Sequence, residues 1–393
     1  MSLAHLQPPA PGAETGAGAD VIFTFSYMTW ATVTRRGFYG AEDRLLQTLL
    51  SHPRVDRMMI CSHLRSAPLK LARDLVGGRV PAPPDHAHLV EPVRLRRIDP
   101  RGERAVRRTY EAYDRALRRH ARRLGLVDPV VVTAHPLIAG YAPLEWARAV
   151  TYYAIDDWTE HPGYARWTED YRRAHARVAA SGRRVVTISD VVLDRIAPTG
   201  PSVVMPNGLD PAEWTRPATP AWTAELGHPL LVYVGTLDSR LDVGSLERLA
   251  DALPHAQIVL AGPVVDGSHL EPLRWRANVE VRPPMGRDDV VGLLRAADVG
   301  LVPHAVSRLT MGMSPLKLYE YLAAGLPVVA TDLPPMRDVD PSVELVAGGS
   351  PLAPAVKRAL ARGRTSEPER LAFVERNAWR TRHERLVELA LAE

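Results

Sequence analysis

The sequence predicts an α/β protein with two doubly wound, Rossmann-like domains, and this prediction rests on two observations. Short apolar segments rich in β-branched residues recur along the chain, and amphipathic stretches of helical period separate them. Strands that are apolar on both faces and alternate with helices are typical of parallel sheets covered on both sides. The same rhythm occurs before residue 203 and again after residue 229, and 393 residues are enough for two such domains.

The expected strands form two groups, one in each half of the chain. In the first half they cover 21–28, 58–62, 130–134, 149–156 and 185–189. In the second half they cover 230–235, 258–263, 279–283, 299–304 and 327–332. Ligands of such sheets bind beyond the carboxyl ends of the strands, so two sheets suggest a cleft between two domains.

The domain boundaries follow from composition. Proline, glycine and threonine become frequent after residue 203 and the periodicity is lost, which predicts a linker at 211–228. The Pro/Gly/Ala-rich residues 1–19 are expected to be a disordered tail. The N-terminal domain is then 20–210 and the C-terminal domain 229–375.

The composition excludes several classes of protein. With 46% hydrophobic and 24% charged residues, the chain is neither intrinsically disordered nor fibrous. Its single cysteine, Cys61, excludes a disulfide framework and a cysteine-based zinc site. The sequence has no apolar run of about 18 residues, and its first twenty residues lack the pattern of a signal peptide. We therefore expect a cytoplasmic protein, and the preference for arginine over lysine suggests a GC-rich bacterial genome.

The most informative segment, 311–331, has the order loop, helix, stop and strand. Ser314 suits an N-cap and Pro315 the first helical position, whereas Gly325 can adopt the left-handed conformation just beyond a helix end. The helix amides and dipole would then point beyond the carboxyl end of strand 299–304. Such a position favours a diphosphate.

Two side chains at this helix start, Lys317 and Glu320, suit the binding of a nucleotide. Lys317 lies in the first turn, and Glu320 follows three residues later on the same face. An ammonium can bind phosphate while a carboxylate accepts hydrogen bonds from both hydroxyls of a ribose. The chain has only three lysines, so a lysine here indicates that a compact ammonium is needed. The alternative is a solvent-exposed ion pair worth under about 1 kcal/mol.

Neighbouring strand ends add to the same rim. Gly235 and Thr236 end one strand, and Gly262 and Pro263 end the next. A glycine at a strand end lets backbone approach a phosphate, and Arg240 offers a second cation. We predict that these residues bind the donor together with four residues at the helix start, Ser314, Pro315, Leu316 and Lys317, and with Glu320.

These motifs resemble the family 4 glycosyltransferases of the GT-B fold, in which two Rossmann-like domains face each other across a cleft. The branch that includes teichuronic-acid-type cell-envelope transferases is especially similar. The resemblance covers roughly residues 130–385 and is most specific in the second half. It is carried by SPLKLYEYLAAGLPVVATDLP (314–334), YVGTLDSRLDV (233–243), IVLAGP (258–263), VMPNGLD (204–210) and YAIDDWTEHPG (153–163).

The resemblance implies a nucleotide-sugar donor in the C-terminal domain, an acceptor in the N-terminal domain, and transfer with retention. Because Arg240, Lys317 and the helix amides could stabilise the leaving diphosphate, we expect no metal or other cofactor. Glu320 matches the glutamate that ends the E-x7-E motif and binds the ribose. Lys317 and Arg240 fall where cations neutralise the diphosphate, and His135 is similar to the histidine near the donor sugar; these three are the expected catalytic residues. The first glutamate of the motif is replaced by Gly312, so a sugar contact is missing or supplied elsewhere. The last helix, 376–393, is expected to return to the N-terminal domain.

The acceptor side is expected to include Trp30, Asp156, Asp157 and Trp158. Adjacent carboxylates normally point apart on an extended chain, and no third ligand lies nearby, so we expect no metal at the acidic pair. The two aspartates can instead cap the segment that follows. His135 has a similar alternative, because a histidine before a proline can simply cap a strand.

A basic segment follows the second expected strand. Residues 94–123 contain twelve arginines and four acidic residues, a net charge of +8, whereas the whole chain has +4. Val106, Tyr110, Tyr113 and Leu117 share one helical face, with the arginines on the others. This helix, near 102–124, could dock on an anionic membrane at the inner membrane face, and the alternative is a solvated basic face. Nucleic acid is not expected, since no recognition fold accompanies the charge.

The function expected from the sequence is a retaining, metal-independent glycosyltransferase. It would move a sugar from a nucleoside diphosphate to a hydroxyl of a glycan, a lipid-linked acceptor or a small natural product. Two alternatives stay open: a nucleotide-sugar epimerase of GT-B architecture, and a catalytically silent nucleotide-sugar-binding partner subunit.

Overall fold

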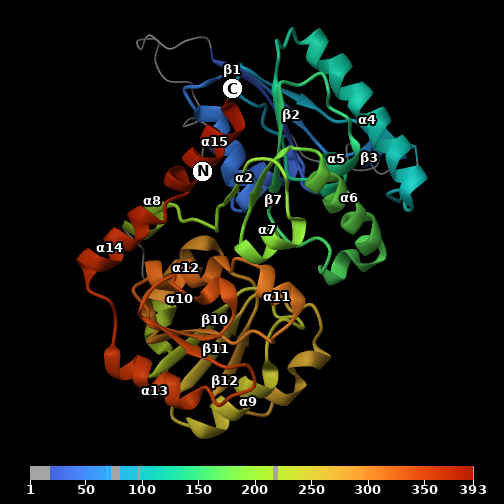
Figure 1. Cartoon of the computed structure of the whole chain (residues 1–393). Helices are drawn as coiled ribbons and strands as arrows, with labels where there is room; N and C mark the ends of the chain where they lie inside the picture. The colour runs from blue at the N-terminus through green and yellow to red at the C-terminus, as the bar shows by residue number, and fades with distance from the viewer. Residues whose placement is uncertain (1–17, 69, 72–79, 96–97, 216–219, 393) are drawn as a thin grey trace. The chain divides into compact units, whose positions relative to one another are not determined.

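The computed structural model describes residues 18–68, 70–71, 80–95, 98–215 and 220–392, which form two compact units (Figure 1). Unit 1 comprises 1–206 and 382–393, and unit 2 comprises 207–381. Of the tail expected to be disordered, 1–17 lies outside the described residues. Ala19 already belongs to the first strand.

Unit 1 is built on a parallel sheet with the strand order β4-β2-β1-β6-β7-β8-β9. In the central register, Phe23 of β1 is opposite Ile60 of β2 and Val132 of β6. A separate short parallel pair joins Arg65–Ser66 (β3) to Val93–Arg94 (β5). The main strands are β1 Ala19–Thr24, β2 Val55–Cys61, β4 Ala87–Val90, β6 Val130–Thr133, β7 Ala149–Ala154, β8 Arg184–Thr187 and β9 Ser202–Val204.

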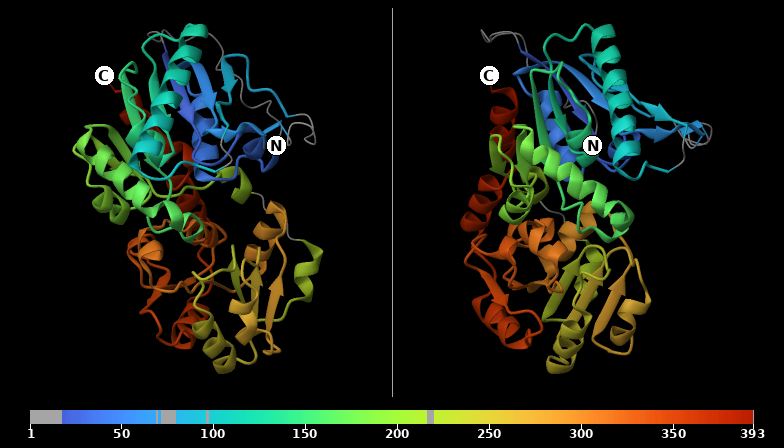
Figure 2. Two further views of the ribbon diagram at one scale, coloured as in Figure 1. Left: turned by 90° about the vertical axis from the view of Figure 1, so that its right-hand side faces the viewer. Right: turned by 45° about the vertical axis from the view of Figure 1, so that its right-hand side comes forward.

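Helices cover both faces of the unit 1 sheet. Because side chains alternate across a strand, Phe23 packs on one face and Ile22 on the other. Helices α2, α7 and the end of α15 bury the Phe23 face, and α4, α5 and α6 bury the Ile22 face (Figures 1 and 2). The helices that pack in this unit are α1 Trp30–Arg35, α2 Ala41–Ser51, α4 Glu103–Arg123, α5 Pro136–Tyr141, α6 Thr168–Ala180, α7 Asp190–Ile196 and, from residue 382, α15 Trp379–Leu391, with a 3₁₀ helix at Pro162–Trp167.

Unit 2 repeats this plan with a parallel sheet of order β12-β11-β10-β13-β14-β15. Val232 faces α10, α12 and α14, while Leu231 faces α9 and α13. The strands are β10 Leu230–Val234, β11 Gln257–Ala261, β12 Val279–Arg282, β13 Val299–Val302, β14 Val328–Thr331 and β15 Val343–Val346. The helices are α8 Pro211–Thr215, α9 Val243–Ala252, α10 Arg287–Ala296, α11 Arg308–Gly312, α12 Leu316–Ala323, α13 Ala353–Arg362 and α14 Glu367–Arg376, with 3₁₀ helices at Ala221–Glu225, Ser268–Leu273 and Pro334–Met336.

The segment expected as a linker, 211–228, lies inside unit 2. It contains α8 and a 3₁₀ helix, and Trp214 and Leu226 are buried in the apolar core of this unit. The two units divide between Pro206 and Asn207. Pro211 begins α8 and Pro220 is the N-cap of the 3₁₀ helix Ala221–Glu225, so these two prolines mark helix starts within unit 2.

Both sheets have a point where the strand order changes direction. In unit 1 it lies between β1 and β6, and in unit 2 between β10 and β13. Open parallel sheets bind ligands beyond the carboxyl ends of the strands at such points. The residues that follow these four strands are therefore the candidate site residues of each unit.

Candidate functional site

Lys317 lies at the switch point of unit 2. Its Nζ donates a hydrogen bond to Tyr233 Oη at 2.6 Å, lies 4.0 Å from the centroid of that ring, and is 3.5 Å from His304 Nε2. Tyr233 is in β10, and His304 follows β13. Burial, together with the neighbouring charge of Arg240, lowers the pKa of Lys317 to about 7. An ammonium therefore lies between the two strands at which a ligand would bind.

Two glycines make this arrangement possible. Gly235 has φ +141°, and a Cβ there would lie 2.9 Å from Lys317 Nζ. Gly262 has φ +146°, and its Cβ would lie 2.1 Å from the carbonyl oxygen of Gly235. Their N–H groups donate to the carbonyls of Ala261 and Arg282 within the sheet edge. The glycines thus permit close approach of protein atoms, and these two amides are already hydrogen-bonded.

The remaining strand-end residues continue this rim. Tyr233 Oη donates to the Thr236 carbonyl at 3.1 Å, and the Pro263 carbonyl accepts from Leu237 N at 2.9 Å. Arg240 forms a two-pronged ion pair with Asp238, with Nε to Oδ1 at 2.9 Å and Nη2 to Oδ2 at 2.7 Å. The structure therefore brings Arg240 and Lys317 near one another, with Arg240 anchored by a carboxylate.

The start of α12 differs from the expectation in one respect. Pro315 is the N-cap, the helix begins at Leu316, and no side chain of the cap residue bonds a helix amide. Ser314 Oγ instead accepts a hydrogen bond from the backbone N of Asn207 at 3.1 Å, and the side-chain amide of Asn207 donates to the Ser314 carbonyl. Ser314 thus lies one residue before the N-cap, and its hydroxyl bonds Asn207. The left-handed Gly325 beyond the helix is confirmed, with φ +81°.

Glu320 lies one turn along α12 and is 4% exposed. Its Oε1 accepts a hydrogen bond from Arg287 Nη1 at 2.6 Å. Arg287 also binds Glu213 of α8. Glu320 is close enough for its negative charge to act on Lys317. The expected cation and carboxylate are thus near neighbours, but Glu320 has an arginine partner that the sequence did not indicate.

His135 occupies the equivalent switch point of unit 1, between β6 and α5. It is 1% exposed, and its Nδ1 accepts a hydrogen bond from the backbone N of Leu137 at 3.1 Å, so it caps α5. Its Nε2 is 3.4 Å from Tyr110 Oη, and its ring lies 4.8 Å from that of Tyr27. Burial, and then the charge of His63, lower the pKa of His135 well below its usual value. The imidazole is therefore neutral near pH 7.

Tyr27 is surrounded by aromatic side chains in unit 1. Trp158 is buried, with ring centroids of Tyr27 and Tyr164 both at 5.3 Å. Tyr27 and Tyr164 stack at 4.7 Å. The indole Nε1 of Trp158 has no hydrogen-bond partner within the described part of the chain. This edge of unit 1 is thus aromatic, with a buried donor.

The acidic pair is used within the protein. Asp157 is 1% exposed, accepts hydrogen bonds from the backbone N and hydroxyl of Thr159, and forms an ion pair with Arg195. Asp156 Oδ1 accepts from the backbone N of Asp157 at 2.7 Å. Across the described residues, no group of three or more His, Cys, Asp or Glu side chains is arranged to hold a metal ion.

The structure places Trp30 at the start of α1. Its side chain is wholly buried in the apolar core of unit 1, together with residues of α2, and its Nε1 donates to the Pro81 carbonyl. A role of Trp30 on the acceptor side stays a prediction.

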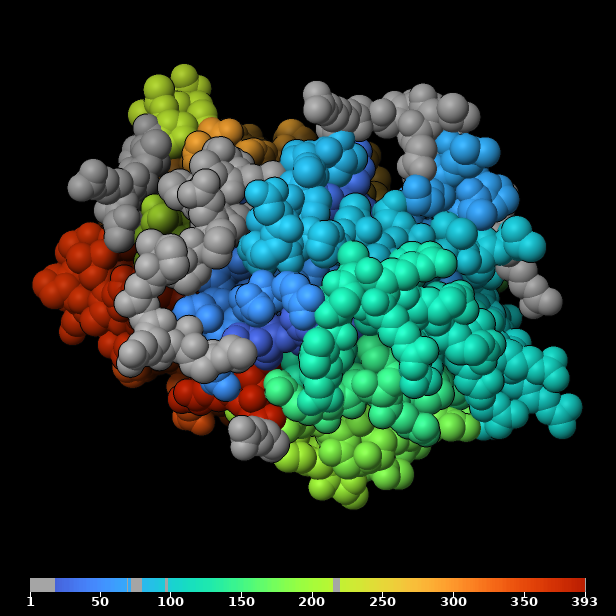
Figure 3. Space-filling view, turned by 90° about the horizontal axis from the view of Figure 1, so that it is seen from above, coloured from blue at the N-terminus to red at the C-terminus, as the bar shows by residue number. Residues whose placement is uncertain are grey.

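The basic segment forms α4, whose apolar face was predicted as the structure has it. Val106, Tyr110, Tyr113 and Leu117 are at most 1% exposed, against the sheet of unit 1. The space-filling view shows α4 beside the segment 80–95 on one face (Figure 3). Leu95 and Ile98, which precede α4 in the chain, are 88% and 56% exposed. Within the described ranges, no helix combines the length and the apolar character needed to cross a membrane.

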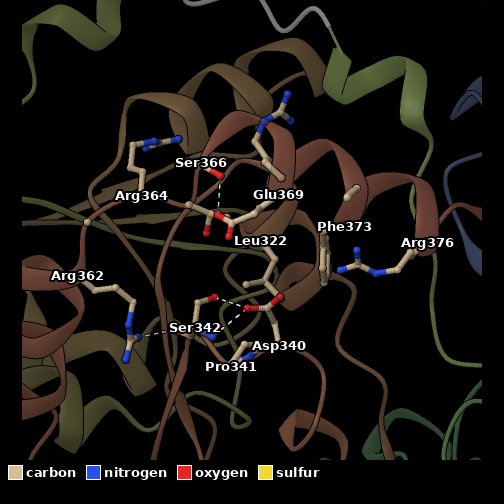
Figure 4. Close-up of a pocket in the computed structure, with 14 residues that line it drawn as sticks. Leu322, Asp340, Pro341, Ser342, Arg362, Arg364, Ser366, Glu369, Phe373 and Arg376 are labelled. Carbon is tan, nitrogen blue, oxygen red and sulfur yellow. Dashed lines mark hydrogen bonds between the residues drawn. The ribbon is translucent and has the colours of Figure 1, made fainter.

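A separate cavity of about 690 Å³ lies in unit 2 away from Lys317 (Figure 4). It is bounded by the end of α12, the loop before β15, and the connection from α13 to α14. Arg364 on its wall donates to the carbonyls of Ala297 and Ala324, and Arg362 donates to the Ser342 carbonyl. These arginines tie the surrounding loops together at the edge opposite the switch point.

Comparison with known proteins gives the class of fold. Trehalose-6-phosphate synthase from E. coli, solved with UDP-2-fluoro glucose, aligns with a TM-score of 0.66 at 12% identity over 95% of this chain and 100% of that one. HepE from Anabaena, solved with UDP and glucose, aligns with a TM-score of 0.59 at 14% identity over 95% and 99%. The fold of the chain is therefore GT-B, as the sequence predicted.

The sequence comparisons are more specific. Residues 228–362 match the family model described as glycosyl transferases group 1. A Bacillus subtilis protein described as a teichuronic acid biosynthesis glycosyltransferase, TuaH, is 33% identical over 108 residues, which is 27% of each chain. Unit 2 thus contains a glycosyltransferase group 1 domain, and the resemblance to GT-B glycosyltransferases is confirmed. These comparisons give no support to the epimerase alternative.

The sequence missed three residues of this site: Tyr233, His304 and Arg287. Tyr233 and His304 lie at the ends of apolar strands, where the sequence pattern signals only core. Arg287 is one of 46 arginines, and nothing in its spacing links it to Glu320, 33 positions later. Only the folded chain brings these three residues to the site.

Proposed function

We propose that the protein is a glycosyltransferase that takes a sugar from a nucleoside diphosphate donor bound at the carboxyl edge of unit 2, and that it does so with retention of configuration and without a metal. The observation that carries the proposal is Lys317, held between Tyr233 and His304 at the switch point of a glycosyltransferase group 1 domain.

Sugar transfer requires stabilisation of the leaving group, which is the nucleoside diphosphate. When the bond from the sugar to the diphosphate breaks, negative charge develops on the diphosphate and positive charge on the sugar ring. Lys317 and Arg240 supply two positive charges at one edge of the sheet, and a charged hydrogen bond contributes about 1.5–3 kcal/mol. This preorganised charge can replace a divalent metal. Retention needs no protein nucleophile if the acceptor hydroxyl attacks from the face that the diphosphate leaves.

The donor's ribose would bind Glu320, one turn from Lys317. The two structural neighbours named above were solved with UDP or a UDP sugar, which makes UDP sugars the first donors to test. Thr236, Gly235, Gly262 and Pro263 would shape the diphosphate subsite.

The acceptor would bind unit 1 at the edge formed by His135, Tyr27 and Trp158. Because Nδ1 of the neutral His135 accepts from Leu137 N, its Nε2–H can donate a hydrogen bond to a sugar hydroxyl without placing a full positive charge beside the sugar, on which positive charge develops. The TuaH relative is described as a teichuronic acid biosynthesis glycosyltransferase, so glycan and lipid-linked acceptors should be tested before small natural products.

A lipid-linked acceptor would agree with a membrane-facing surface on unit 1. We place this surface on the arginine face of α4 and on Leu95 and Ile98, which are exposed and precede α4 in the chain. Basic side chains beside exposed apolar ones suit an anionic lipid surface. Sedimentation with phosphatidylglycerol vesicles should exceed that with phosphatidylcholine vesicles, and reversal of Arg118 and Arg122 to glutamate should abolish the difference. Equal sedimentation with both lipids would remove the membrane from the proposal.

The activity is tested by nucleoside diphosphate release. The protein is incubated with UDP-, GDP- and ADP-sugars, with and without glycan or polyprenyl-phosphate-linked acceptors. Acceptor-dependent release supports transfer, and the anomeric configuration of the product, determined by NMR, tests retention. Lys317→Met should abolish release, whereas Lys357→Met, on the exposed face of α13, serves as the matched control.

One residue, Gly312, favours a second candidate function. Gly312, which replaces the first glutamate of the family motif, ends α11 and is buried. If this loss leaves the sugar without an essential contact, the protein would bind nucleotide sugars without transferring them. Tight nucleotide-sugar binding without release in any combination of donor and acceptor would favour this partner-subunit role.

A further inference from the structure

Arg287 is an unusual residue for its position in the fold. It is the first residue of α10, where the helix dipole favours acidic side chains and disfavours a cation. The next two residues, Asp288 and Asp289, follow the usual preference. An arginine that goes against the local electrostatic preference indicates a role set by its tertiary contacts.

The guanidinium of Arg287 lies between two carboxylates. Nη1 donates to Glu320 Oε1 at 2.6 Å. Nε and Nη2 donate to Glu213 Oε2 at 2.9 and 2.6 Å. The cation also lies 5.3 Å from the ring centroid of Trp214, which is wholly buried. Three elements, α8, α10 and α12, therefore fix the direction of this side chain.

Glu320 needs such a partner. Its side chain is only 5% exposed, and a buried carboxylate is costly unless it is paired and hydrogen-bonded. Arg287 compensates that cost through Oε1. Because Glu213 holds two other donors of the same guanidinium, Arg287 cannot easily rotate to follow Glu320 or to leave it. The carboxylate is thus held in one orientation before any ligand binds.

We propose that Arg287, anchored by Glu213, is a positioning residue that orients the Glu320 carboxylate for the ribose hydroxyls of the donor. This inference rests on the proposed function, in which Glu320 binds the ribose. Arg287 does not itself touch the nucleotide. It acts by holding the Glu320 carboxylate in one orientation, so its loss should remove discrimination between a ribose and a 2′-deoxyribose while leaving diphosphate binding by Lys317 in place.

The competing explanation is a purely structural clamp that joins α8, α10 and α12. A structural clamp would change the stability of unit 2, and it would weaken all ligands equally. A positioning residue changes the ratio of the affinities for two nucleotides that differ only in the 2′-hydroxyl. This ratio therefore distinguishes the two roles.

The experiment measures dissociation constants by calorimetry for UDP, GDP and ADP, each beside its 2′-deoxy counterpart. The full-length wild type is compared with Arg287→Met, Arg287→Lys and Glu213→Gln. Arg276→Met is the matched control, because Arg276 also lies between two carboxylates, Glu247 and Asp251, with a similar side-chain exposure of 22% against 25%. Thermal denaturation of each variant reports stability separately.

For the ribonucleotide that binds most tightly, we expect the wild type to prefer the ribose form by about tenfold or more, the effect of one hydrogen bond to a charged group. Arg287→Met should bring this ratio to within about twofold of unity, because it weakens the ribose form, which binds Glu320 through two hydroxyls, more than the 2′-deoxy form, which keeps only the 3′-hydroxyl. Glu213→Gln should lower the ratio by a smaller factor, Arg287→Lys should retain part of it, and Arg276→Met should leave it unchanged. In Glu320→Gln, which itself loses the ratio, adding Arg287→Met should have little further effect on it.

The outcomes separate the two proposals. If the wild type binds none of the nucleotides, the proposed function fails. If the wild type prefers the ribose form and both Arg287→Met and Glu213→Gln keep the full ratio, the positioning role alone is overturned. If Arg287→Met does not fold, the soluble Glu213→Gln and Arg287→Lys variants decide, and an unchanged ratio in both contradicts the inference.

Discussion

The carboxyl edges of the two sheets have the same topology but opposite chemistry. At the switch point of unit 1, the neutral His135 lies among the aromatic rings of Tyr27 and Tyr110. At the switch point of unit 2, Lys317 lies beside Tyr233 and His304, with Arg240 nearby. Parallel sheets with the same strand order thus provide the location, and the few residues that follow their strands decide what binds. A charged edge suits a diphosphate, and an aromatic edge suits a neutral sugar or acceptor.

The largest effect that we expect is structural and belongs to unit 2. Gly262→Ala places a Cβ about 2.1 Å from the Gly235 carbonyl oxygen at φ +146°. Backbone must move to relieve this contact, so the free energy of unfolding should fall by roughly 2–4 kcal/mol. Chemical denaturation measures the loss.

The control for this change lies in unit 1. Gly182 has φ +66°, and a Cβ at this position would have no described atom within 4 Å, so Gly182→Ala should cost only about 1 kcal/mol. Equal losses for the two variants would show that the close packing at Gly262 has no energetic weight.

The next effect is on nucleotide affinity and separates the two edges directly. Lys317→Met should weaken UDP binding about 10- to 100-fold, because one charged contact to the diphosphate is removed. His135→Ala should leave UDP affinity within about twofold and lower the turnover number instead. Calorimetry and initial rates measure the two quantities. A large loss of UDP affinity in His135→Ala would break the division of roles between the units.

A pH dependence follows from the same lysine and should be smaller. In the free protein the pKa of Lys317 is about 7, and the groups that face it are Tyr233, His304, Arg240, Asp238 and Glu320. The protonated form binds the anion, so affinity is full below pH 7 and falls as pH rises above it. The decrease is at most about tenfold per pH unit, and it ends at the pKa of the complex.

The measurement is UDP affinity between pH 7 and 9 in wild type and Lys317→Met. The wild-type affinity should fall across this range, and that of Lys317→Met should stay flat. Because His135 is already neutral at pH 7, it adds no slope here. Parallel slopes in the two proteins would assign the titration to another group.

Removal of divalent metal is expected to have no effect on the transferase rate. Asp157 is engaged by Thr159 and Arg195, so it is poorly placed to bind a metal. EDTA should therefore leave the transferase rate unchanged. Loss of activity with rescue by Mn²⁺ would instead make Asp156 and Asp157 metal ligands.

The sequence predicted the buried parts of the fold well because burial leaves a clear pattern. The ten expected strands, such as 130–134 and 299–304, are present within a few residues. The strands it missed include β4, β9 and β15, which lie at sheet edges and each carry one or two exposed side chains. An edge strand need not be apolar on both faces, so its sequence does not differ from that of a loop.

The sequence predicted only those site residues that are close to one another along the chain. Lys317 and Glu320 are three residues apart on one helix, and periodicity alone relates them. Arg287 and Tyr233 reach the same region through the fold, from positions 30 and 84 residues before Lys317. Ser314 is not the N-cap, because α12 begins one residue later, and its hydroxyl instead bonds a distant residue, Asn207. Local propensity describes a helix in isolation, whereas tertiary partners decide its ends.

The most direct test of the account is a crystal structure of the protein soaked with UDP, GDP and ADP in turn. The account predicts a diphosphate within hydrogen-bonding distance of Lys317 Nζ, beyond the ends of β10 and β13, with a ribose at Glu320. A nucleotide found instead in the cavity beside Arg362 and Arg364 (Figure 4), or at the aromatic edge of unit 1, would contradict it.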